Sequence, residues 1–215
     1  YETFRPGQKE VIERVLDSTN TLAVMPTGGG KSICYQVPGL TLDGTAIIIS
    51  PLISLMKDQV DSLLALGIPA TFINSSLSTE EQETRMSEIA DGRYKFVYVA
   101  PERFESNGFI HVIRQIKLSL VAFDEAHCIS QWGHDFRPSY RSIVPNLKKI
   151  GNIPVFMALT ATATEEVIAD IQELLTIEKP NVINTGFARD NLAFHIVKGK
   201  DRTSYIRAFL EEHKE

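Results

Sequence analysis

The sequence predicts an α/β fold in which helices cover both faces of a mostly parallel central sheet. Short β-branched apolar runs alternate with helical stretches along most of the 215 residues, as in parallel sheets. The first run ends in three glycines followed by Lys31 and Ser32, and a later run, residues 119–123, ends in Asp124 and Glu125. Polar groups placed directly after such strands are typical of ligand sites in this fold class.

The periodicity of apolar residues places the elements in order. Strands are expected at residues 21–24, 45–50, 70–74, 94–99, 119–123, 155–159 and 182–183, with a further strand-like run at 192–197. Helices are expected from Gln8, directly after Ser32, after Pro51, at 78–90, after Thr164 and at 205–212. The helix at 78–90 has a capping-box spacing, with Ser78 followed by Glu81. We expect a first domain at residues 1–187, and a hinge with the truncated start of a second domain at 188–215.

Composition and charge exclude several classes of protein. A hydrophobic content of 43% with 23% charged residues is typical of a globular protein with a sizeable core. The net charge of −5 argues against a protein that coats nucleic acid by bulk electrostatics, so any such contact must be local. No signal peptide and no apolar run of membrane-spanning length is present, so we expect a cytoplasmic location and no membrane partner.

Two further predictions concern the cysteines and the first residue of the sequence. Cys34 and Cys128 are too few for a disulfide framework or a four-cysteine zinc site, so we expect both to be reduced and structural. The sequence opens at Tyr1 without a methionine, and we expect it to be part of a longer protein.

Residues 25–32, Met-Pro-Thr-Gly-Gly-Gly-Lys-Ser, are interpreted as a phosphate-binding loop between a strand and a helix. Glycines let backbone amides turn inward and approach a polyphosphate, and the following helix N-terminus favours anions. The expected nucleotide-binding residues are Thr27, Gly28, Gly29, Gly30, Lys31 and Ser32. Lys31 would reach the β- and γ-phosphates and the Ser32 hydroxyl would bind Mg²⁺. The general pattern has glycine where this chain has Met25, and the alternative is a glycine-rich turn.

Asp124, Glu125 and His127 follow the strand at 119–123 and complete the predicted catalytic group with Lys31. A carboxylate at the tip of a buried strand beside a phosphate-binding loop holds Mg²⁺ together with the loop hydroxyl, here Ser32. Glu125 is placed to take a proton from the attacking water, and His127 to link the site to what lies beyond. An ordinary acidic loop is the alternative, which the pairing with Lys31 and Ser32 disfavours.

Gln8 stands near the start of the first expected helix. A glutamine amide can pair with N6 and N7 of adenine, so Gln8 could read the base of ATP while the loop holds its phosphates. The alternative is a polar residue in the first turn of a helix.

Two segments carry candidate phosphate contacts. Ser54 and Lys57 follow a strand at a helix N-terminus, where they could touch a nucleic-acid backbone. The alternative is an ordinary amphipathic helix, and in either case Leu52, Leu55 and Met56 are expected to pack inward. Arg103 follows the strand at 94–99 and is a second candidate, with a surface ion pair as its alternative.

Residues 131–138, here named the aromatic loop, interleave aromatic and basic side chains in a segment broken by Gly133 and Pro138. Aromatic side chains stack on unpaired bases, at about 1–3 kcal/mol per base, and cations pair with phosphates. The candidate residues are Trp132, His134, Phe136 and Arg137. The alternative is a loop pinned to the core by at least one of Trp132 and Phe136.

Thr160 and Thr162 follow the strand at 155–159. Their hydroxyls are expected to sense the γ-phosphate or to bond to residues 124–127, here named the carboxylate loop, and so to help couple the site to a nucleic-acid contact. The alternative for this segment is a simple helix start capped by Thr164.

With these motifs in hand, the chain closely resembles the RecQ-family DNA helicases of helicase superfamily two. The resemblance covers nearly the whole chain. It is carried by Phe-Arg-Pro-Gly-Gln at 4–8, MPTGGGKS at 25–32, SPLISLMKDQV at 50–60, Asp-Glu-Ala-His at 124–127 with the aromatic loop after it, and LTATAT at 159–164. Met25 is normal in that family. Residues 187–191, Phe-Ala-Arg-Asp-Asn, depart from the family's usual Phe-Asp-Arg-Pro-Asn.

The resemblance implies a RecA-like P-loop NTPase domain that uses ATP and Mg²⁺ and binds single-stranded and partly duplex DNA. Arg5 and Gln8 would contact adenine, and the aromatic loop would sense single-stranded DNA and couple it to ATP hydrolysis. Unwinding with 3′-to-5′ polarity in repair and recombination is implied as well. Such an enzyme would be nucleoid-associated in a bacterium and nuclear in a eukaryote.

The resemblance also implies parts that these residues lack, above all a second RecA-like domain with arginine fingers. Because an arginine finger contributes about 10³–10⁵ in rate, we expect this chain alone to hydrolyse ATP poorly and not to unwind DNA. Two alternatives stay open, a DEAH-type RNA helicase or non-unwinding translocase, and a nucleic-acid-binding module with an unproductive ATP site. The aromatic loop disfavours the first, and the intact Lys31, Asp124 and Glu125 disfavour the second.

Overall fold

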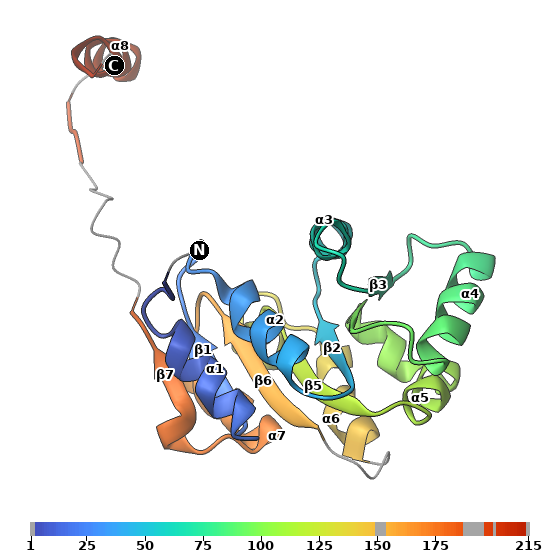
Figure 1. The fold of residues 1–215 in the computed structure, drawn as a ribbon. Helices are drawn as coiled ribbons and strands as arrows, with labels where there is room; N and C mark the ends of the chain where they lie inside the picture. Colours follow the sequence, from blue (N-terminus) through green and yellow to red (C-terminus); the bar gives the residue numbers. More distant parts are fainter. Residues whose placement is uncertain (1–2, 149–153, 187–195, 200, 214–215) are drawn as a thin grey trace.

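The computed structural model describes residues 3–148, 154–186, 196–199 and 201–213. Its centre is a seven-stranded sheet in the order β3-β4-β2-β5-β6-β1-β7, and every pairing is parallel (Figure 1). The strands are β1 Thr21–Val24, β2 Thr45–Ile49, β3 Ala70–Ile73, β4 Phe96–Val99, β5 Leu118–Phe123, β6 Val155–Thr160 and β7 Val182–Asn184. These seven predicted strands are confirmed to within two residues at each end.

The described residues also form eight α-helices and three short 3₁₀ segments. The helices are α1 Gln8–Leu16, α2 Lys31–Thr41, α3 Ile53–Ala65, α4 Thr79–Ala90, α5 Asn107–Ile113, α6 Pro138–Lys148, α7 Glu165–Leu175 and α8 Arg202–Glu212. The 3₁₀ segments are η1 Pro101–Glu105, η2 Ala126–Ile129 and η3 Lys179–Asn181. None of the described helices is long and apolar enough to cross a membrane.

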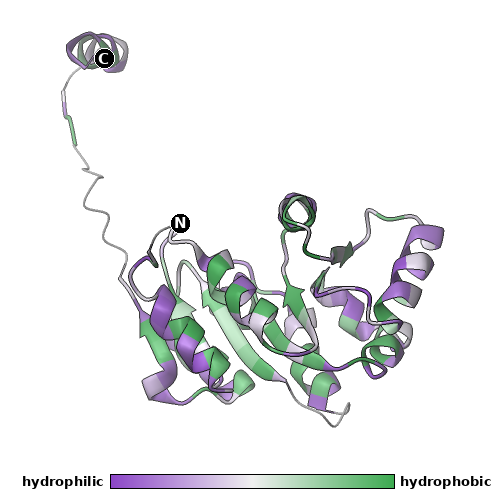
Figure 2. Ribbon diagram, in the orientation of Figure 1, coloured by the Kyte–Doolittle hydropathy of each residue, from purple (hydrophilic) through white to green (hydrophobic). Residues whose placement is uncertain are grey.

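Alternating side chains along the strands build two separate apolar layers, one on each face of the sheet. Figure 2 shows that the strands are mostly hydrophobic. In β2, Ile47 and Ile49 pack with α5, α6 and α7, while Ala46 and Ile48 pack with α1, α2 and α3. Both faces are covered, so the strands are apolar almost throughout, as buried parallel strands are. The predicted α/β class with helices on both faces is confirmed.

The sequence did not predict α5 and α6, and it did not predict η2, which contains Cys128 and Ile129. Pro138 was interpreted as a break, whereas it is the first residue of α6, a position where a missing N–H costs nothing. The predicted domain boundary at Phe187 lies outside the described residues. Most of the strand-like run from Leu192 lies outside them as well, and its described part, Ile196 and Val197, is not a strand.

The carboxyl ends of β2, β5, β6 and β1 are neighbours in the sheet. The loops after these four strands therefore meet at one edge, although the chain visits them far apart in sequence.

Candidate functional site

The loop at residues 25–30 connects β1 to α2 and is shaped by glycine. Gly28 and Gly30 both have φ of +79°, a region that side chains other than glycine rarely adopt. A Cβ on Gly30 would also lie 2.4 Å from Gln8 Nε2. Gly29 N–H donates to the Pro26 carbonyl at 2.9 Å, which closes the loop just before α2 begins at Lys31. The strand is thus followed by a tight loop and a helix N-terminus, the arrangement that binds anions such as phosphate.

Lys31 folds back over this loop. Its Nζ donates to the Met25 carbonyl at 3.5 Å, a long hydrogen bond that a phosphate oxygen could replace.

Arg5 and Gln8 hold the loop from the N-terminal side. Gln8 Nε2 donates to the Gly30 carbonyl at 3.0 Å and to the Gly29 carbonyl at 3.3 Å, and Gln8 Oε1 accepts from the Arg5 N–H at 2.8 Å. Arg5 Nη1 donates to the Gly28 carbonyl. Gln8 is the first residue of α1, as the simpler interpretation has it, yet it is only 4% exposed and bonded to the glycine loop. Its contact with adenine stays a prediction.

Asp124 and Glu125 stand at the end of β5, opposite the glycine loop. The Asp124 N–H donates to the Ile49 carbonyl at 2.8 Å, and the Ser50 hydroxyl donates to Asp124 Oδ2 at 3.4 Å. Burial, and secondly the neighbouring Glu125 charge, raise the pKa of Asp124 to about 6. Glu125 adopts a left-handed backbone with φ of 47°, which turns the chain sharply into η2.

The residues present fit a magnesium ion. The Ser32 hydroxyl and the Asp124 carboxylate line one cavity, and Mg²⁺ at nucleotide sites takes one or two carboxylates plus phosphate oxygens and waters. Among the described residues no cluster of three or more His, Cys, Asp or Glu side chains is present. A dedicated all-protein metal cage is therefore absent from this part of the chain.

His127 lies between the carboxylates and the aromatic loop. Its Nδ1 is 3.1 Å from Thr160 Oγ1 and 3.4 Å from Glu125 Oε2, and its ring stacks on His134 at 4.1 Å between centroids. Burial, and secondly the His134 charge, lower the pKa of His127, so the ring is neutral at physiological pH. Thr160 therefore bonds to the carboxylate loop, which is one of the two roles expected for it. The residue is fully buried.

Thr162 lies two residues after Thr160, beyond the end of β6. Its N–H donates to Thr160 Oγ1 at 3.2 Å, and its carbonyl accepts from the same hydroxyl at 3.0 Å. The Thr164 hydroxyl caps α7 by accepting from the Val167 N–H, so the simpler interpretation holds for that residue.

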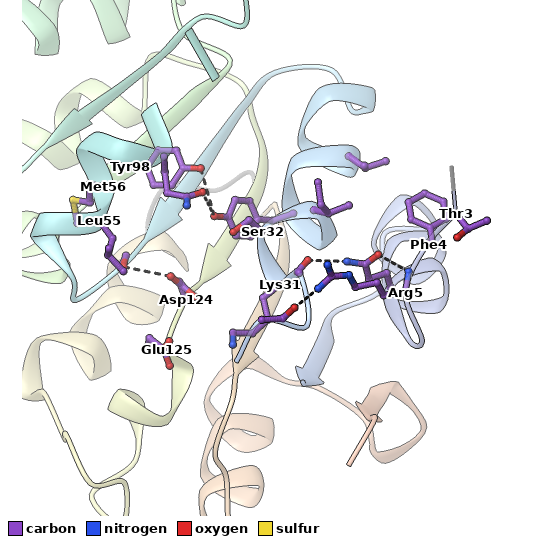
Figure 3. Close-up of a pocket in the computed structure, with 18 residues that line it drawn as sticks. Thr3, Phe4, Arg5, Lys31, Ser32, Leu55, Met56, Tyr98, Asp124 and Glu125 are labelled. Carbon is purple, nitrogen blue, oxygen red and sulfur yellow. Dashed lines mark hydrogen bonds between the residues drawn. The ribbon is translucent and has the colours of Figure 1, made fainter. Parts of the chain in front are cut away.

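A cavity of about 580 Å³ joins the glycine loop and its contacts Arg5 and Gln8 to Asp124 and Glu125, whereas His127, Thr160 and Thr162 lie outside its lining (Figure 3). Lys31 and Ser32 lie between Arg5 on one side and Asp124 and Glu125 on the other. The cavity extends beyond the predicted site to Tyr35, Gln59 and Tyr98, which sequence reasoning missed. The Tyr98 hydroxyl donates to the Tyr35 hydroxyl at 3.4 Å, which donates to Gln59 Oε1 at 3.5 Å. Tyr98 belongs to β4, Tyr35 to α2 and Gln59 to α3. Only the fold brings these three elements together, and no sequence motif indicated the three residues. Ser50, in the same wall, was missed for the same reason.

The family model of DEAD/DEAH box helicases matches residues 5–171, from Arg5 beside the glycine loop to α7. The chain belongs to the DEAD/DEAH box helicase family. Within it, the chain is similar to the ATP-dependent DNA helicase RecQ of Bacillus subtilis, at 53% identity over the whole chain and 36% of that protein. It is 46% identical to the ATP-dependent DNA helicase RecQ of Pasteurella multocida, over 92% of this chain and 31% of that protein. The chain thus spans about a third of the length of these relatives.

A solved helicase has the same fold. The structure of Mycobacterium smegmatis helicase Lhr bound to ssDNA and AMP-PNP aligns with a TM-score of 0.69 at 17% identity, over 88% of this chain and 27% of that one. The RecA-like fold expected from the sequence is confirmed.

In this helicase domain the aromatic loop presents its large side chains to solvent. Trp132 is 66% exposed and Phe136 is 37% exposed, so the alternative that one of them pins the loop to the core is wrong. The loop is tied down by polar groups instead. The Arg137 N–H donates to the Cys128 carbonyl at 3.0 Å, and its guanidinium bonds to Pro51 and Asp135. The stacked His134 adds a further anchor.

The remaining candidates lie on other elements. Ser54 is exposed in the first turn of α3, and Lys57 Nζ pairs with Asp61 Oδ2 at 2.6 Å on the exposed side of that helix. Arg103 Nη1 donates to Gln82 Oε1 at 2.7 Å, a bond to a neutral amide where the alternative expected an ion pair. Their contacts with a nucleic acid stay predictions.

One part of the expected packing in α3 is wrong. Met56 is buried as expected, but Leu52 is 38% exposed and Leu55 is 50% exposed. Apolar residues occur almost all round the first turn of α3, and the face that meets the sheet is instead the one with Met56, Val60 and Leu63.

Proposed function

We propose that this chain is the ATP-binding motor domain of a DNA helicase that couples ATP hydrolysis to 3′-to-5′ translocation and unwinding in DNA repair and recombination. One observation carries the proposal: the carboxylate loop and the aromatic loop touch each other through His127. His127 Nδ1 lies 3.4 Å from Glu125 Oε2, and its ring stacks on His134 of the aromatic loop. The names of the two RecQ relatives support DNA as the nucleic acid. Such an enzyme would work at the nucleoid or in the nucleus.

The ATP chemistry follows from the groups around the cavity. The backbone amides of the glycine loop and Lys31 bind the polyphosphate, with Arg5 and Gln8 on the side proposed for adenine. Ser32 and Asp124 would hold Mg²⁺, which neutralises phosphate charge when bound. Glu125 orients the attacking water and accepts its proton.

Coupling to DNA follows from the position of His127. DNA bases stacked on Trp132 and Phe136 would shift the aromatic loop, and with it His134. Because His134 stacks on His127, that shift would reorient His127 against Glu125 and Thr160. A neutral His127 can accept or donate one hydrogen bond at Nδ1, which lets it reset the position of the Glu125 carboxylate.

A second RecA-like domain is the partner that we propose for full activity. The relatives are about three times as long as this chain, and phosphoryl transfer in motor proteins gains about 10³–10⁵ from an arginine finger. The 215-residue chain alone should therefore bind ATP weakly, hydrolyse it slowly and leave duplex DNA intact. Strand separation by the purified chain would overturn this part of the proposal.

The nature of the polymer is tested by ATP turnover with single-stranded DNA and with RNA of the same sequence. The full-length protein should be stimulated by the DNA and much less by the RNA. Equal or greater stimulation by RNA would overturn the DNA assignment and favour an RNA helicase or translocase.

A further inference from the structure

One carboxylate anchors the start of the aromatic loop. Ser130, the residue before the loop, is fully buried, and its hydroxyl has two partners. It accepts from the Trp132 N–H at 3.1 Å and donates to Asp170 Oδ2 at 2.5 Å. Asp170 belongs to α7, so this short hydrogen bond joins the backbone under Trp132 to a helix packed on the sheet.

The same carboxylate is linked to the other end of the loop through Arg141 of α6. Arg141 Nη2 lies 3.6 Å from Asp170 Oδ2, and Arg141 Nε donates to the Ile129 carbonyl at 3.5 Å. The guanidinium carbon sits 5.7 Å from the centroid of the Phe136 ring, within cation–π range. The backbone of Trp132 is therefore connected to Asp170 through Ser130, and the Phe136 ring is connected to it through Arg141.

The turn that presents Trp132 has little freedom of its own. The Gly133 N–H donates to the Ser130 carbonyl at 3.0 Å, and a Cβ on Gly133 would lie 2.1 Å from the His127 carbonyl oxygen. Because the turn is packed this closely against η2, the hydrogen bond to Ser130 fixes the backbone from which Trp132 projects. Asp170 in turn fixes the orientation of the Ser130 hydroxyl.

We propose that Asp170 is the positioning residue of the aromatic loop. Its carboxylate holds Trp132 and Phe136 in one fixed arrangement on the surface before any DNA arrives. Ordering mobile side chains opposes binding, so a preset pair of aromatic faces strengthens stacking on single-stranded DNA. The consequence for DNA rests on the proposed function, whereas the positioning itself does not.

Trp132 is the only tryptophan in the 215 residues, so its fluorescence reports the loop directly. The test compares the time-resolved anisotropy of Trp132 in the wild-type chain, Asp170→Asn and Ser130→Ala, without nucleotide or DNA. Asp43→Asn is the matched control, because it removes a carboxylate from an exposed pair with Lys117 that is remote from the loop. Circular dichroism melting shows whether each variant is folded.

In both loop variants the amplitude of fast Trp132 motion should rise by about twofold, while Asp43→Asn stays at the wild-type value. Titration with an oligo-dT strand should then give a Kd roughly five- to tenfold weaker for both loop variants. Ser130→Ala keeps the Asp170–Arg141 pair and carries the test if Asp170→Asn does not fold.

Folded variants with wild-type anisotropy would overturn the positioning role, whatever the DNA result. A rise in Trp132 motion with no oligo-dT binding by any form, wild type included, would support the positioning role and count against the proposed function.

Discussion

Glu125 performs the proton transfer that we propose for ATP hydrolysis, so its neutral isostere is the sharpest test of that step. Glu125→Gln keeps the size of the side chain but cannot accept a proton from water. In the full-length protein, ATP turnover should fall by about 10²–10⁴-fold because general-base catalysis is lost. ATP should still bind, because the phosphate contacts stay. Phosphate release and calorimetric ATP binding measure the two effects. Glu83→Gln, on the exposed side of α4, is the control. Unchanged turnover in Glu125→Gln would contradict the assignment.

Asp124 makes the stability of the metal-free chain depend on pH. Its pKa in the folded chain, about 6, is higher than the ordinary value of 3.8, so the folded state prefers the protonated form. That stabilisation is complete below about pH 4 and is lost as the pH rises through 6.

Asp124→Asn removes this dependence because asparagine is neutral at every pH. Relative to wild type, the variant should gain of the order of 2–3 kcal/mol in unfolding free energy between pH 4 and pH 8. Urea unfolding in EDTA at several pH values measures the gain. A constant difference between the two proteins across this range would show that Asp124 titrates normally.

Among the elements, α2 packs closely against β2 and β4 at Gly39. A Cβ at Gly39 would lie 2.5 Å from Phe96 Cε1 and 3.2 Å from Ala46 Cβ. Gly39→Ala should therefore destabilise the fold by about 1–3 kcal/mol through overpacking, despite the better helix propensity of alanine. The matched change Gly108→Ala in α5 meets nothing closer than 3.6 Å and should be neutral or stabilising. Thermal unfolding compares the two, and equal effects would contradict the packing argument.

Local signals in the sequence were sufficient for most elements. The Ser78–Glu81 capping box at α4 is present with both of its hydrogen bonds, and the apolar runs mark the strands. The packing predicted for Leu52 and Leu55 was wrong, because apolar residues lie almost all round the first turn of α3 and so indicate no unique buried face there. The missed α6 starts at Pro138 and contains Pro145, and proline is weak evidence against a helix when it stands at the first position.

For the molecule as a whole, the site could be predicted where a motif fixes the chemistry and not where the fold alone makes the contact. Lys31 and Asp124 were paired from sequence because both follow buried strands that end at one edge of a parallel sheet. The stacking of His134 on His127 and the Tyr98–Tyr35–Gln59 hydrogen bonds depend on strand order and loop path. No spacing rule encodes either of them, so both needed the structure.

Coupling between the aromatic loop and the ATP site is tested most directly by ATP turnover of the full-length protein, with and without single-stranded DNA, in wild type and Trp132→Ala. Trp132 is exposed and does not line the cavity proposed for ATP, so the basal rate should be unchanged. Since a stacked base contributes about 1–3 kcal/mol, the variant should need roughly tenfold or more DNA for stimulation, or lose it. Normal stimulation of Trp132→Ala, or turnover that ignores DNA in the wild type, would contradict the coupling.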